Sequence, residues 1–397
     1  MILKDKEILL GISGGISAYK ICELVRLLVK AGAHPQVVMT ENAGKFVSPL
    51  TFETLSQRPV YTDLFARGEK PVLHIELADK AELLVIAPAT ANIIGKIANG
   101  IADDLLSTLY LAFSGKVLVC PAMNVKMYQH PAVQENLRRL RNRGVEILEP
   151  EEGELACGWE GKGRLAEPEV ILEACEYLLA PKDFAGKKIL ISAGPTREAI
   201  DPVRFISNRS SGKMGYAIAR ASRVRGAEVI LVSGPVQLPP PLGVELVRVE
   251  SAKEMKRACL KYSSWADVII KAAAVADFSP KLKTSSKIKK EKLPKAIGLE
   301  PTPDILAELG KKKKKGQVLV GFAAETEEVL KNARKKLKEK NLDLIVANDV
   351  SRKDAGFEVD TNICTLIFRD GKKKQLPKMT KIEIAHKLLD LIQGLLK

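Results

Sequence analysis

Apolar runs and amphipathic patterns alternate along the first half of the chain. The runs KEILLGIS (6–13), HPQVVMT (34–40), AELLVIAPAT (81–90) and GKVLVCPAM (115–123) are short and rich in aliphatic residues, which is typical of strands buried on both faces. Between the first two, SAYKICELVRLLVKAG (17–32) has apolar residues at helical spacing. This alternation predicts a parallel sheet covered by helices on both faces.

The alternation breaks once and then starts again. LLAPKDFAGKK (178–188) contains a proline and a glycine that interrupt the helical pattern. We therefore predict a first domain at 1–180, a linker at 181–187 and a second domain at 188–397. Strand and helix patterns alternate again beyond the linker, so the predicted fold class is α/β, with two doubly wound, Rossmann-like domains. The last strands and helix have their own pattern: TNICTLIF and KKKQLPKM predict a β-hairpin around Asp370 and Gly371, followed by a closing helix.

Composition narrows the class of protein without naming a reaction. A length of 397 residues and a hydrophobic content of 46% suit two domains that each have a core. The six cysteines show no metal-ligand spacing. The sequence shows no signal-peptide pattern and no apolar run long enough to cross a bilayer. We therefore expect a cytoplasmic protein with reduced cysteines and no membrane partner.

The net charge of +15 is unevenly distributed, because residues 281–315 contain twelve lysines and only four acidic residues. Such a segment could bind nucleic acid or a triphosphate, or remain a solvated surface. No zinc-finger, basic-zipper or aromatic RNA-binding motif accompanies it, so we expect no nucleic-acid partner. Lys311–Lys315 are expected to form a solvated turn before the strand QVLVGFAA (317–324).

Motifs rich in glycine and amide side chains follow three predicted strands of the first domain. GISGGISAYK (11–20) forms a strand-to-helix turn that could hold a phosphate or be only a tight turn. APATAN (87–92) and PAMNVKMY (121–128) follow two later strands, at the edge where open α/β sheets bind ligands. His74 lies just before a helix-like segment. Together these motifs predict a ligand site at the carboxyl ends of the strands.

This combination resembles the flavin-dependent cysteine decarboxylases. The glycine-rich turn, His74 and the two motifs occur in the family's order, with Thr90, Ile93 and Tyr128 in place of the family's serine, threonine and tryptophan. ACGWEGKGR (156–164) resembles the branch of the family that acts on phosphopantothenoylcysteine. The resemblance implies FMN as the cofactor. The expected FMN contacts are Ser13, Gly14, Thr40, Thr90, Asn92 and Met123.

The resemblance also implies an oxidative decarboxylation, in which the substrate thiol becomes a thioaldehyde and carbon dioxide can then leave. His74 is expected to handle a proton near neutral pH. The amide of Asn124 is expected to fix the substrate carboxylate. The segment 151–165 is polar and glycine-rich and has no helical or strand period, which predicts an irregular loop. Cys157 in this loop is expected to supply the proton for the final reduction, with the loop acting as a lid over the substrate.

The second half opens with a dense motif, ISAGPTREAIDPVRFISNRSSGKMG (191–215). A dinucleotide turn is one interpretation, but the motif lacks a nicotinamide fingerprint and the acidic residue that would hold a ribose. With KAAAVADF (271–278), PTPDILAEL (301–309), GFAAET (321–326) and NLDLIVANDV (341–350), it resembles the phosphopantothenate–cysteine ligase domain. The resemblance implies CTP as the nucleotide. The expected CTP contacts are Lys271, Ala272, Ala273, Asp277, Lys287, Pro303, Asp304, Ile305, Leu306, Phe322, Lys336 and Lys340.

In that family the carboxylate of 4′-phosphopantothenate attacks the α-phosphate of CTP, and the amine of cysteine then displaces CMP from the acyl-cytidylate. Asn208 matches the residue that engages the acyl-cytidylate, Arg204 lies in the same motif, and Lys287 is expected on a flap that closes on phosphates. Mg²⁺ is the expected metal, with no ligands assigned. Without the resemblance, Lys336 and Lys340 would be interpreted as one solvated helix face.

The two resemblances are adjacent in one chain, which predicts a bifunctional enzyme of coenzyme A biosynthesis. The ligase would make phosphopantothenoylcysteine, and the decarboxylase would convert it to 4′-phosphopantetheine. The alternatives are a flavoprotein oxidoreductase with a nicotinamide domain, and a flavin-fold regulatory or nucleic-acid-binding protein without turnover. The resemblance also implies a homo-oligomer, with trimeric decarboxylase contacts, dimeric ligase contacts and, for fused chains, a dodecamer.

Overall fold

The computed structural model describes residues 2–65, 72–154, 158–289, 296–325, 328–349 and 359–396. The chain divides into two compact units, Met1–Ala180 and Pro181–Lys397. Each unit contains a sheet with helices on both faces, which confirms the predicted fold class. Among the helices within the described ranges, none is both long and apolar enough to span a membrane.

The first unit is built on a five-stranded parallel sheet with the strand order β2-β1-β3-β4-β5. The central strands are buried along almost their whole length, because helices cover both faces. In this order the winding reverses between β1 and β3, which is where doubly wound sheets bind ligands. The strands are β1 (Glu7–Ile12), β2 (His34–Met39), β3 (Leu83–Ala89), β4 (Lys116–Pro121) and β5 (Glu146–Ile147).

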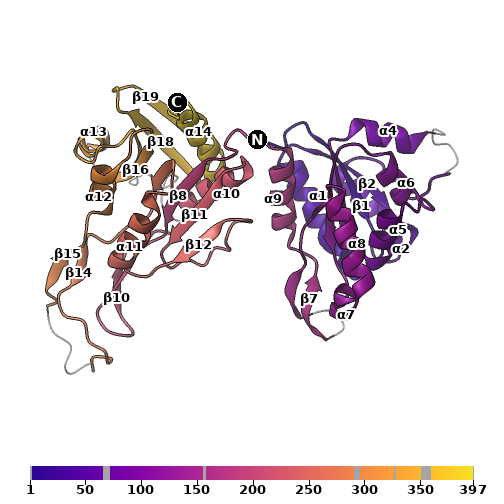
Figure 1. Ribbon diagram of the computed structural model, residues 1–397, viewed down its shortest axis with the longest axis horizontal. Helices are drawn as coiled ribbons and strands as arrows, with labels where there is room; N and C mark the ends of the chain where they lie inside the picture. Colours follow the sequence, from indigo (N-terminus) through magenta and orange to yellow (C-terminus); the bar gives the residue numbers. More distant parts are fainter. Residues whose placement is uncertain are drawn as a thin grey trace. The chain divides into compact units, whose positions relative to one another are not determined.

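Helices cover both faces of this sheet (Figure 1), and an aliphatic core lies between the sheet and each helix layer. Helices α1, α3 and α9 contribute to one core, and α4, α5, α6 and α8 contribute to the other. The helices are η1 (Ile16–Lys20), α1 (Ile21–Lys30), α2 (Glu41–Gly44), α3 (Pro49–Ser56), α4 (Leu73–Lys80), α5 (Ala91–Asn99), α6 (Leu105–Ala112), α7 (Val125–Gln129), α8 (Pro131–Asn142) and α9 (Pro168–Leu179).

A β-hairpin occupies the segment that the sequence predicted to be an irregular polar loop. Strands β6 (Glu151–Glu154) and β7 (Glu160–Arg164) pair antiparallel on either side of the predicted lid tip. The loop prediction for these two strands is therefore wrong. Neither strand has the apolar alternation that marks a strand half-buried on a core, so the pairing left no pattern in the sequence.

The second unit contains an eight-stranded sheet in the order β12-β11-β8-β13-β16-β17-β18-β19. Numbered along the chain, its first six strands lie in the order 3-2-1-4-5-6 and are parallel, with the reversal point between β8 and β13. The predicted hairpin of β18 and β19 is confirmed and extends the sheet antiparallel. The strands are β8 (Lys188–Ala193), β11 (Glu228–Ser233), β12 (Glu245–Arg248), β13 (Val268–Lys271), β16 (Val318–Glu325), β17 (Leu344–Asp349), β18 (Thr361–Phe368) and β19 (Lys373–Thr380).

Helices again cover both faces of this sheet, with α10 and α14 on one core and α11, α12 and α13 on the other (Figure 1). Two small antiparallel pairs, β9 with β10 and β14 with β15, extend from the sheet. The helices are α10 (Lys213–Val224), α11 (Ala252–Ser263), α12 (Ile305–Lys312), α13 (Val329–Glu339) and α14 (Lys381–Gln393), and the short strands are β9 (Arg197–Ala199), β10 (Phe205–Ser207), β14 (Phe278–Pro280) and β15 (Leu299–Pro301).

The segment 181–187 packs onto the second unit. Phe184 is completely buried in the core under α10 and α14. The Arg225 guanidinium pairs with Asp183 and with Asp390 of α14, at 2.7 Å from Asp390 Oδ1. This buried cation therefore connects the segment to the end of α10 and to the last helix.

The lysine run before β16 is not the simple solvated turn that the sequence predicted. Lys311 and Lys312 complete the last turn of α12. The Lys313 ammonium is largely buried and donates to Asp343 Oδ1 at 2.8 Å and to the Asn341 carbonyl at 3.0 Å. The ion pair with Asp343 joins the end of α12 to the start of β17, which only tertiary packing could reveal.

Candidate active sites

The first candidate site lies at the carboxyl edge of the first sheet, at the reversal point between β1 and β3. Ser13 directly follows β1, and Thr90 follows β3 as the N-cap of α5. The Thr90 N–H donates to Ser13 Oγ at 3.0 Å, and Ser13 Oγ donates to the Pro88 carbonyl at 2.6 Å. The buried Ser13 hydroxyl therefore connects the two strand ends and fixes the position of Thr90.

Gly14 shapes the same edge by allowing a close approach. A Cβ atom on Gly14 would lie 2.5 Å from the Cβ atom of Asn42, so any larger residue would displace the start of α2. Thr40 caps that helix with its side-chain oxygen, and Asn92 is exposed in the first turn of α5. Hydroxyl, amide and backbone N–H groups thus gather on three adjacent strand ends. These donors fit the phosphate and polar ring edge of FMN.

The motif PAMNVKMY lies beside the β3 end. The Ala122 N–H donates to the Ala89 carbonyl at 3.0 Å, which aligns this motif with APATAN. Asn124 is the N-cap of α7, and its Oδ1 accepts a hydrogen bond from the Lys126 N–H at 2.9 Å. This bond fixes the plane of the amide that was predicted to hold the substrate carboxylate.

The β6–β7 hairpin is anchored on the same motif. The Met123 N–H donates to the Gly163 carbonyl at 3.0 Å. A Cβ atom on Gly163 would lie 2.2 Å from the Met123 carbonyl oxygen, and one on Gly161 would lie 2.9 Å from the Val125 side chain. Glycine is therefore required at both positions for the hairpin to lie this close. Cys157 lies outside the described residues, between the two strands of the hairpin in sequence.

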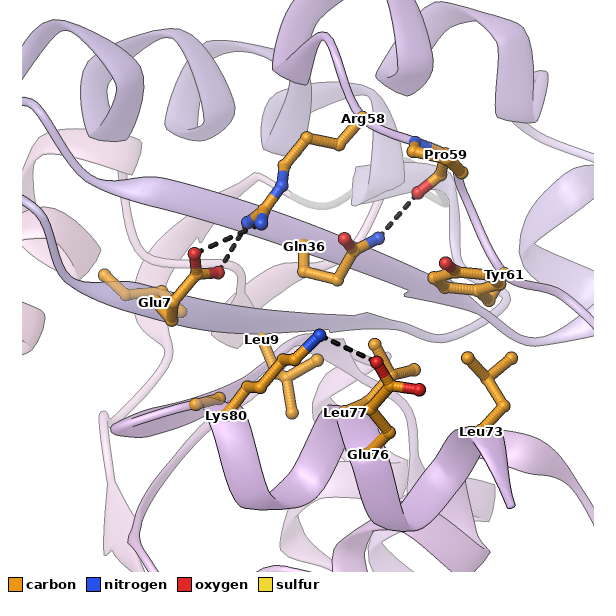
Figure 2. Close-up of a pocket in the computed structure, with 12 residues that line it drawn as sticks. Glu7, Leu9, Gln36, Arg58, Pro59, Tyr61, Leu73, Glu76, Leu77 and Lys80 are labelled. Carbon is orange, nitrogen blue, oxygen red and sulfur yellow. Dashed lines mark hydrogen bonds and ion pairs between the residues drawn. The ribbon is translucent and has the colours of Figure 1, made fainter. Parts of the chain in front are cut away.

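His74 is the half-buried second residue of α4, so it lies within this helix and not just before it as predicted. A cavity of about 300 Å³ lies between α4 and the strands β1 and β2 (Figure 2). None of the predicted site residues lines it. Its ionic groups pair with one another, Arg58 with Glu7 and Lys80 with Glu76, as Figure 2 shows. These internal pairs leave the cavity without the convergent polar groups of a catalytic site.

The second candidate site is a cavity of about 450 Å³ at the carboxyl edge of the second sheet. It lies at the reversal point of that sheet, because its lining includes the residues that follow β13 and the start of α10. The Asn208 amide donates to the Ala274 carbonyl at 3.0 Å, which draws the SNRSSGKMG segment against the β13 end. The predicted residues that line the cavity are Asn208, Ala272, Ala273, Asp277 and Phe322.

Several polar residues of this cavity were absent from the predicted site. Lys213 is the first residue of α10, and its Nζ lies 2.7 Å from Asp360 Oδ1. Lys381 begins α14, and burial, assisted by the Lys213 charge, lowers its pKa to about 8. Within the described ranges, Asn348 Oδ1 is buried without a hydrogen-bond partner. The polar lining residues that the sequence did not predict are Arg209, Ser210, Lys213, Asn348, Asn362 and Lys381.

The cavity lining collects residues from six separate segments of the chain, which explains why these residues were missed. Arg209 and Lys213 lie in the motif at 191–215, and their positive charge near a predicted helix start is the signal that could have identified them. Asn348, Asn362 and Lys381 come from β17, β18 and α14, and no spacing in the sequence connects them. Only the sheet order brings these three to the same edge.

The remaining predicted nucleotide residues group around the start of α12. Asp304 caps this helix and pairs with Lys340 at 2.9 Å, just after the end of α13. Burial alone would raise the pKa of the Asp304 carboxyl, but the bond from Lys340 holds it below its usual range. Lys271 is buried beside the Met255 sulfur, and burial lowers its pKa to about 8. The predicted residues outside the cavity lining on this side are Lys271, Pro303, Asp304, Ile305, Leu306, Lys336 and Lys340.

Arg204 and Lys287 do not line the cavity either, but Asp201 connects their segments. The buried Asp201 carboxylate accepts hydrogen bonds from the N–H groups of Arg204 at 2.8 Å and Ile288 at 3.3 Å. Burial alone would raise the pKa of Asp201, whereas these N–H donors hold it below its usual range. The Lys287 side chain is exposed on the segment that Asp201 holds. Asp201 lies within the motif at 191–215 and was not among the predicted site residues.

No metal centre accompanies the two sites among the residues that the structure describes, since no three His, Cys, Asp or Glu side chains form a cluster that could hold an ion.

Known proteins that are similar to this chain carry both halves in one chain. The family model for flavoproteins matches residues 2–179, and the model for the DNA/pantothenate metabolism flavoprotein C-terminal domain matches residues 184–395. A coenzyme A biosynthesis bifunctional protein CoaBC from Bacillus subtilis is 53% identical over 401 residues, which cover 100% of this chain and 98% of the relative.

The chain belongs to the CoaBC family of bifunctional proteins. Another CoaBC protein, from Vibrio cholerae, is 48% identical over 98% of this chain and 98% of its own length. The solved C-terminal domain of a CoaBC protein is 50% identical and covers 54% of this chain and 98% of its own length, with a TM-score of 0.47. This family membership over the full length confirms the family that the motifs of both halves predicted.

Proposed function

We propose that the chain is a bifunctional enzyme of coenzyme A biosynthesis that ligates 4′-phosphopantothenate to cysteine and then decarboxylates the product to 4′-phosphopantetheine. The observation that carries this proposal is the presence of two separate switch-point sites, each lined by the motifs of one reaction. Membership of the CoaBC family over the whole chain supports the pairing of the two reactions. We assign ligation to Pro181–Lys397 and decarboxylation to Met1–Ala180.

The ligase cavity suits two anionic substrates. The ammonium groups of Lys213 and Lys381 and the start of α10 provide positive potential for the phosphate of 4′-phosphopantothenate. Asn208 holds the acyl-cytidylate, since its amide lies against the β13 end where the reacting carboxylate meets CTP. Asp277 and Phe322 contact CTP from the cavity. These groups position two anions for attack on the α-phosphate.

The residues around Asp304 form the second wall of the CTP site in this proposal. Lys340 is already paired with Asp304, so it must release that carboxylate to reach a triphosphate. Lys336 and Lys287 bind the phosphates by charge, and Lys271 to Ala273 and Pro303 to Leu306 bind by backbone contact. Mg²⁺ enters with CTP, because triphosphates carry this ion with most of its water ligands.

The decarboxylase site would hold FMN at the β1, β2, β3 and β4 ends, through Ser13, Gly14, Thr40, Thr90, Asn92 and Met123. When bound, FMN supplies the oxidation of the substrate and the return of its electrons. Asn124 holds the substrate carboxylate, His74 moves a proton, and Cys157 gives the proton for the final reduction. The hydrogen bond from Lys126 to Asn124 supports this role, because it fixes the amide before substrate arrives.

Oligomeric state and location are part of the proposal. We infer a cytoplasmic homo-oligomer in which the decarboxylase units contact as trimers and the ligase units as dimers. Exposed large apolar side chains on the first unit are available for such contacts. They include Phe46, Leu50, Val72, Ile75, Ile101 and Leu111.

One assay tests both activities at once. The purified protein is given 4′-phosphopantothenate, cysteine, CTP and Mg²⁺, and pyrophosphate and carbon dioxide are followed together. Both products are expected, with ATP in place of CTP giving less pyrophosphate. Pyrophosphate without carbon dioxide would confine the activity to the ligase, and absence of both would overturn the proposal.

A further inference from the structure

A cation–aromatic contact joins the β6–β7 hairpin to the start of α7. The Lys126 ammonium lies 4.1 Å from the centroid of the Trp159 ring. Trp159 comes directly before β7, and Lys126 is the second residue of α7. The Trp159 side chain is 49% exposed, so the contact lies at the protein surface and not in a core.

Lys126 takes part in two contacts that meet at the proposed substrate site. Its backbone N–H donates to Asn124 Oδ1 at 2.9 Å, and its side chain reaches the Trp159 ring. A shift of the hairpin therefore acts on the same residue that fixes the Asn124 amide. Asn124 and Trp159 are 35 positions apart in the sequence, and Lys126 contacts both.

The Lys126–Trp159 contact is weaker than the other contacts that hold the hairpin in place. The β7 strand is fixed by the Met123–Gly163 hydrogen bond and by glycines that leave no room for a side chain. Lys162 adds an ion pair to Glu149 at 2.6 Å, and Tyr128 donates to the same carboxylate at 2.6 Å. The Lys126–Trp159 contact is exposed and single, so it changes an equilibrium by only about two- to fivefold. A contact of this size can form and break during each turnover.

We propose that Lys126 is a positioning residue of the decarboxylase, which couples the Asn124 amide to the hairpin through the ring of Trp159. This inference rests on the proposed decarboxylation, because it takes Asn124 as the group that holds the substrate carboxylate. Binding of phosphopantothenoylcysteine at Asn124 then strengthens the Lys126–Trp159 contact. Conversely, loss of the contact weakens substrate binding and leaves the chemical step almost unchanged.

Fluorescence tests the contact without reference to activity. The chain has two tryptophans, so the FMN-loaded W265F protein reports Trp159 alone. In the K126M variant we expect acrylamide quenching of Trp159 to rise about twofold, because the ammonium covers one of the two ring faces. K126R should quench like the parent. Addition of phosphopantothenoylcysteine should lower quenching in the parent and not in K126M, and equal quenching in all three proteins would overturn the inference.

Kinetics test the coupling. K126M and W159L should each raise the KM for phosphopantothenoylcysteine about two- to fivefold with kcat nearly unchanged, whereas K126R and W159F should retain the parent KM. The double variant should be no worse than either single variant, because both remove one contact. Additive effects, or an unchanged KM in both single variants, would contradict the coupling.

A matched control lies in the other unit, where Lys188 stands 5.7 Å from the Trp265 ring centroid. K188M removes the same kind of contact and should leave the decarboxylase KM unchanged. FMN absorbance and circular dichroism confirm that each variant folds, which the exposure of Lys126 and Trp159 favours. If the unchanged protein releases no carbon dioxide, the proposed decarboxylation has failed, whereas the quenching result still decides whether the contact exists.

Discussion

The two candidate sites occupy the same topological position and differ in charge. Both lie at the carboxyl edge of a parallel sheet, where the order of winding reverses, between β1 and β3 in one unit and β8 and β13 in the other. The predicted FMN contacts are all uncharged. The second site adds Arg209, Lys213 and Lys381 at its lining.

This difference follows from what each site is proposed to hold. A flavin has a large neutral ring and one phosphate, which helix starts and hydroxyl groups can satisfy. A phosphorylated acid and a triphosphate repel one another, so their approach needs fixed cations. The sheet topology therefore sets the position of each site, and the side chains at the strand ends set which ligand the site can bind.

The sharpest separation of the two sites should come from Cys157→Ser. Serine cannot donate a proton as a thiol does near neutral pH, so decarboxylation should continue while the final reduction stops. We expect the oxidised enethiol to replace nearly all 4′-phosphopantetheine, with pyrophosphate release unchanged. Mass spectrometry of the products measures this. Cys22→Ser, a partly buried cysteine of the same unit, is the control and should form the normal product.

Gly14→Ala should damage only the flavin site. The added Cβ would lie 2.5 Å from Asn42, and overpacking of this kind costs about 1–3 kcal/mol, equivalent to roughly five- to 150-fold in FMN affinity. FMN titration followed by absorbance measures the loss, and ligase activity should persist. Gly44→Ala is the matched control, since a Cβ there meets nothing within 4 Å. Equal FMN affinity in both variants would contradict the assignment of Gly14 to the FMN site.

Lys381→Met tests whether the second site depends on charge. Loss of a charged donor to a phosphate costs about 1.5–3 kcal/mol, so the KM for 4′-phosphopantothenate should rise about tenfold or more. The pKa of Lys381 is lowered to about 8, so the ammonium is present below that pH and lost above it. The parent KM should therefore rise between pH 7 and 9.5, while that of the variant stays flat. A pH-dependent KM in the variant would assign the titration to another group.

The smallest effect is expected from Lys340→Glu. Lys340 is paired with Asp304, so the Asp304 carboxylate already neutralises part of its charge in the parent. The KM for CTP should therefore rise only severalfold, which corresponds to about 1 kcal/mol of binding free energy. Lys336→Glu should act in the same direction. Lys338→Glu is the matched control on an exposed position of the same helix. Unchanged CTP kinetics in the first two variants would remove α13 from the nucleotide site.

Local patterns predicted most of the fold because buried parallel strands and amphipathic helices leave strong periodicity. β1, β3 and α14 could each be predicted from a few residues. The β6–β7 hairpin could not, since its strands have no apolar face. Lys313 was predicted to be solvated because a run of lysines does not indicate which member meets a distant carboxylate.

Contiguous residues were enough to predict the two α/β halves, the turn motifs and the family, because each of these leaves a local pattern in the sequence. Tertiary structure alone decided which side chains share an edge. The Thr90 N–H donates to Ser13, and the Arg204 and Ile288 N–H groups donate to Asp201. Lys381 lines the same cavity as Asn208. The physical reason is that the order of strands in a sheet depends on packing between segments far apart in the chain, which no local periodicity records.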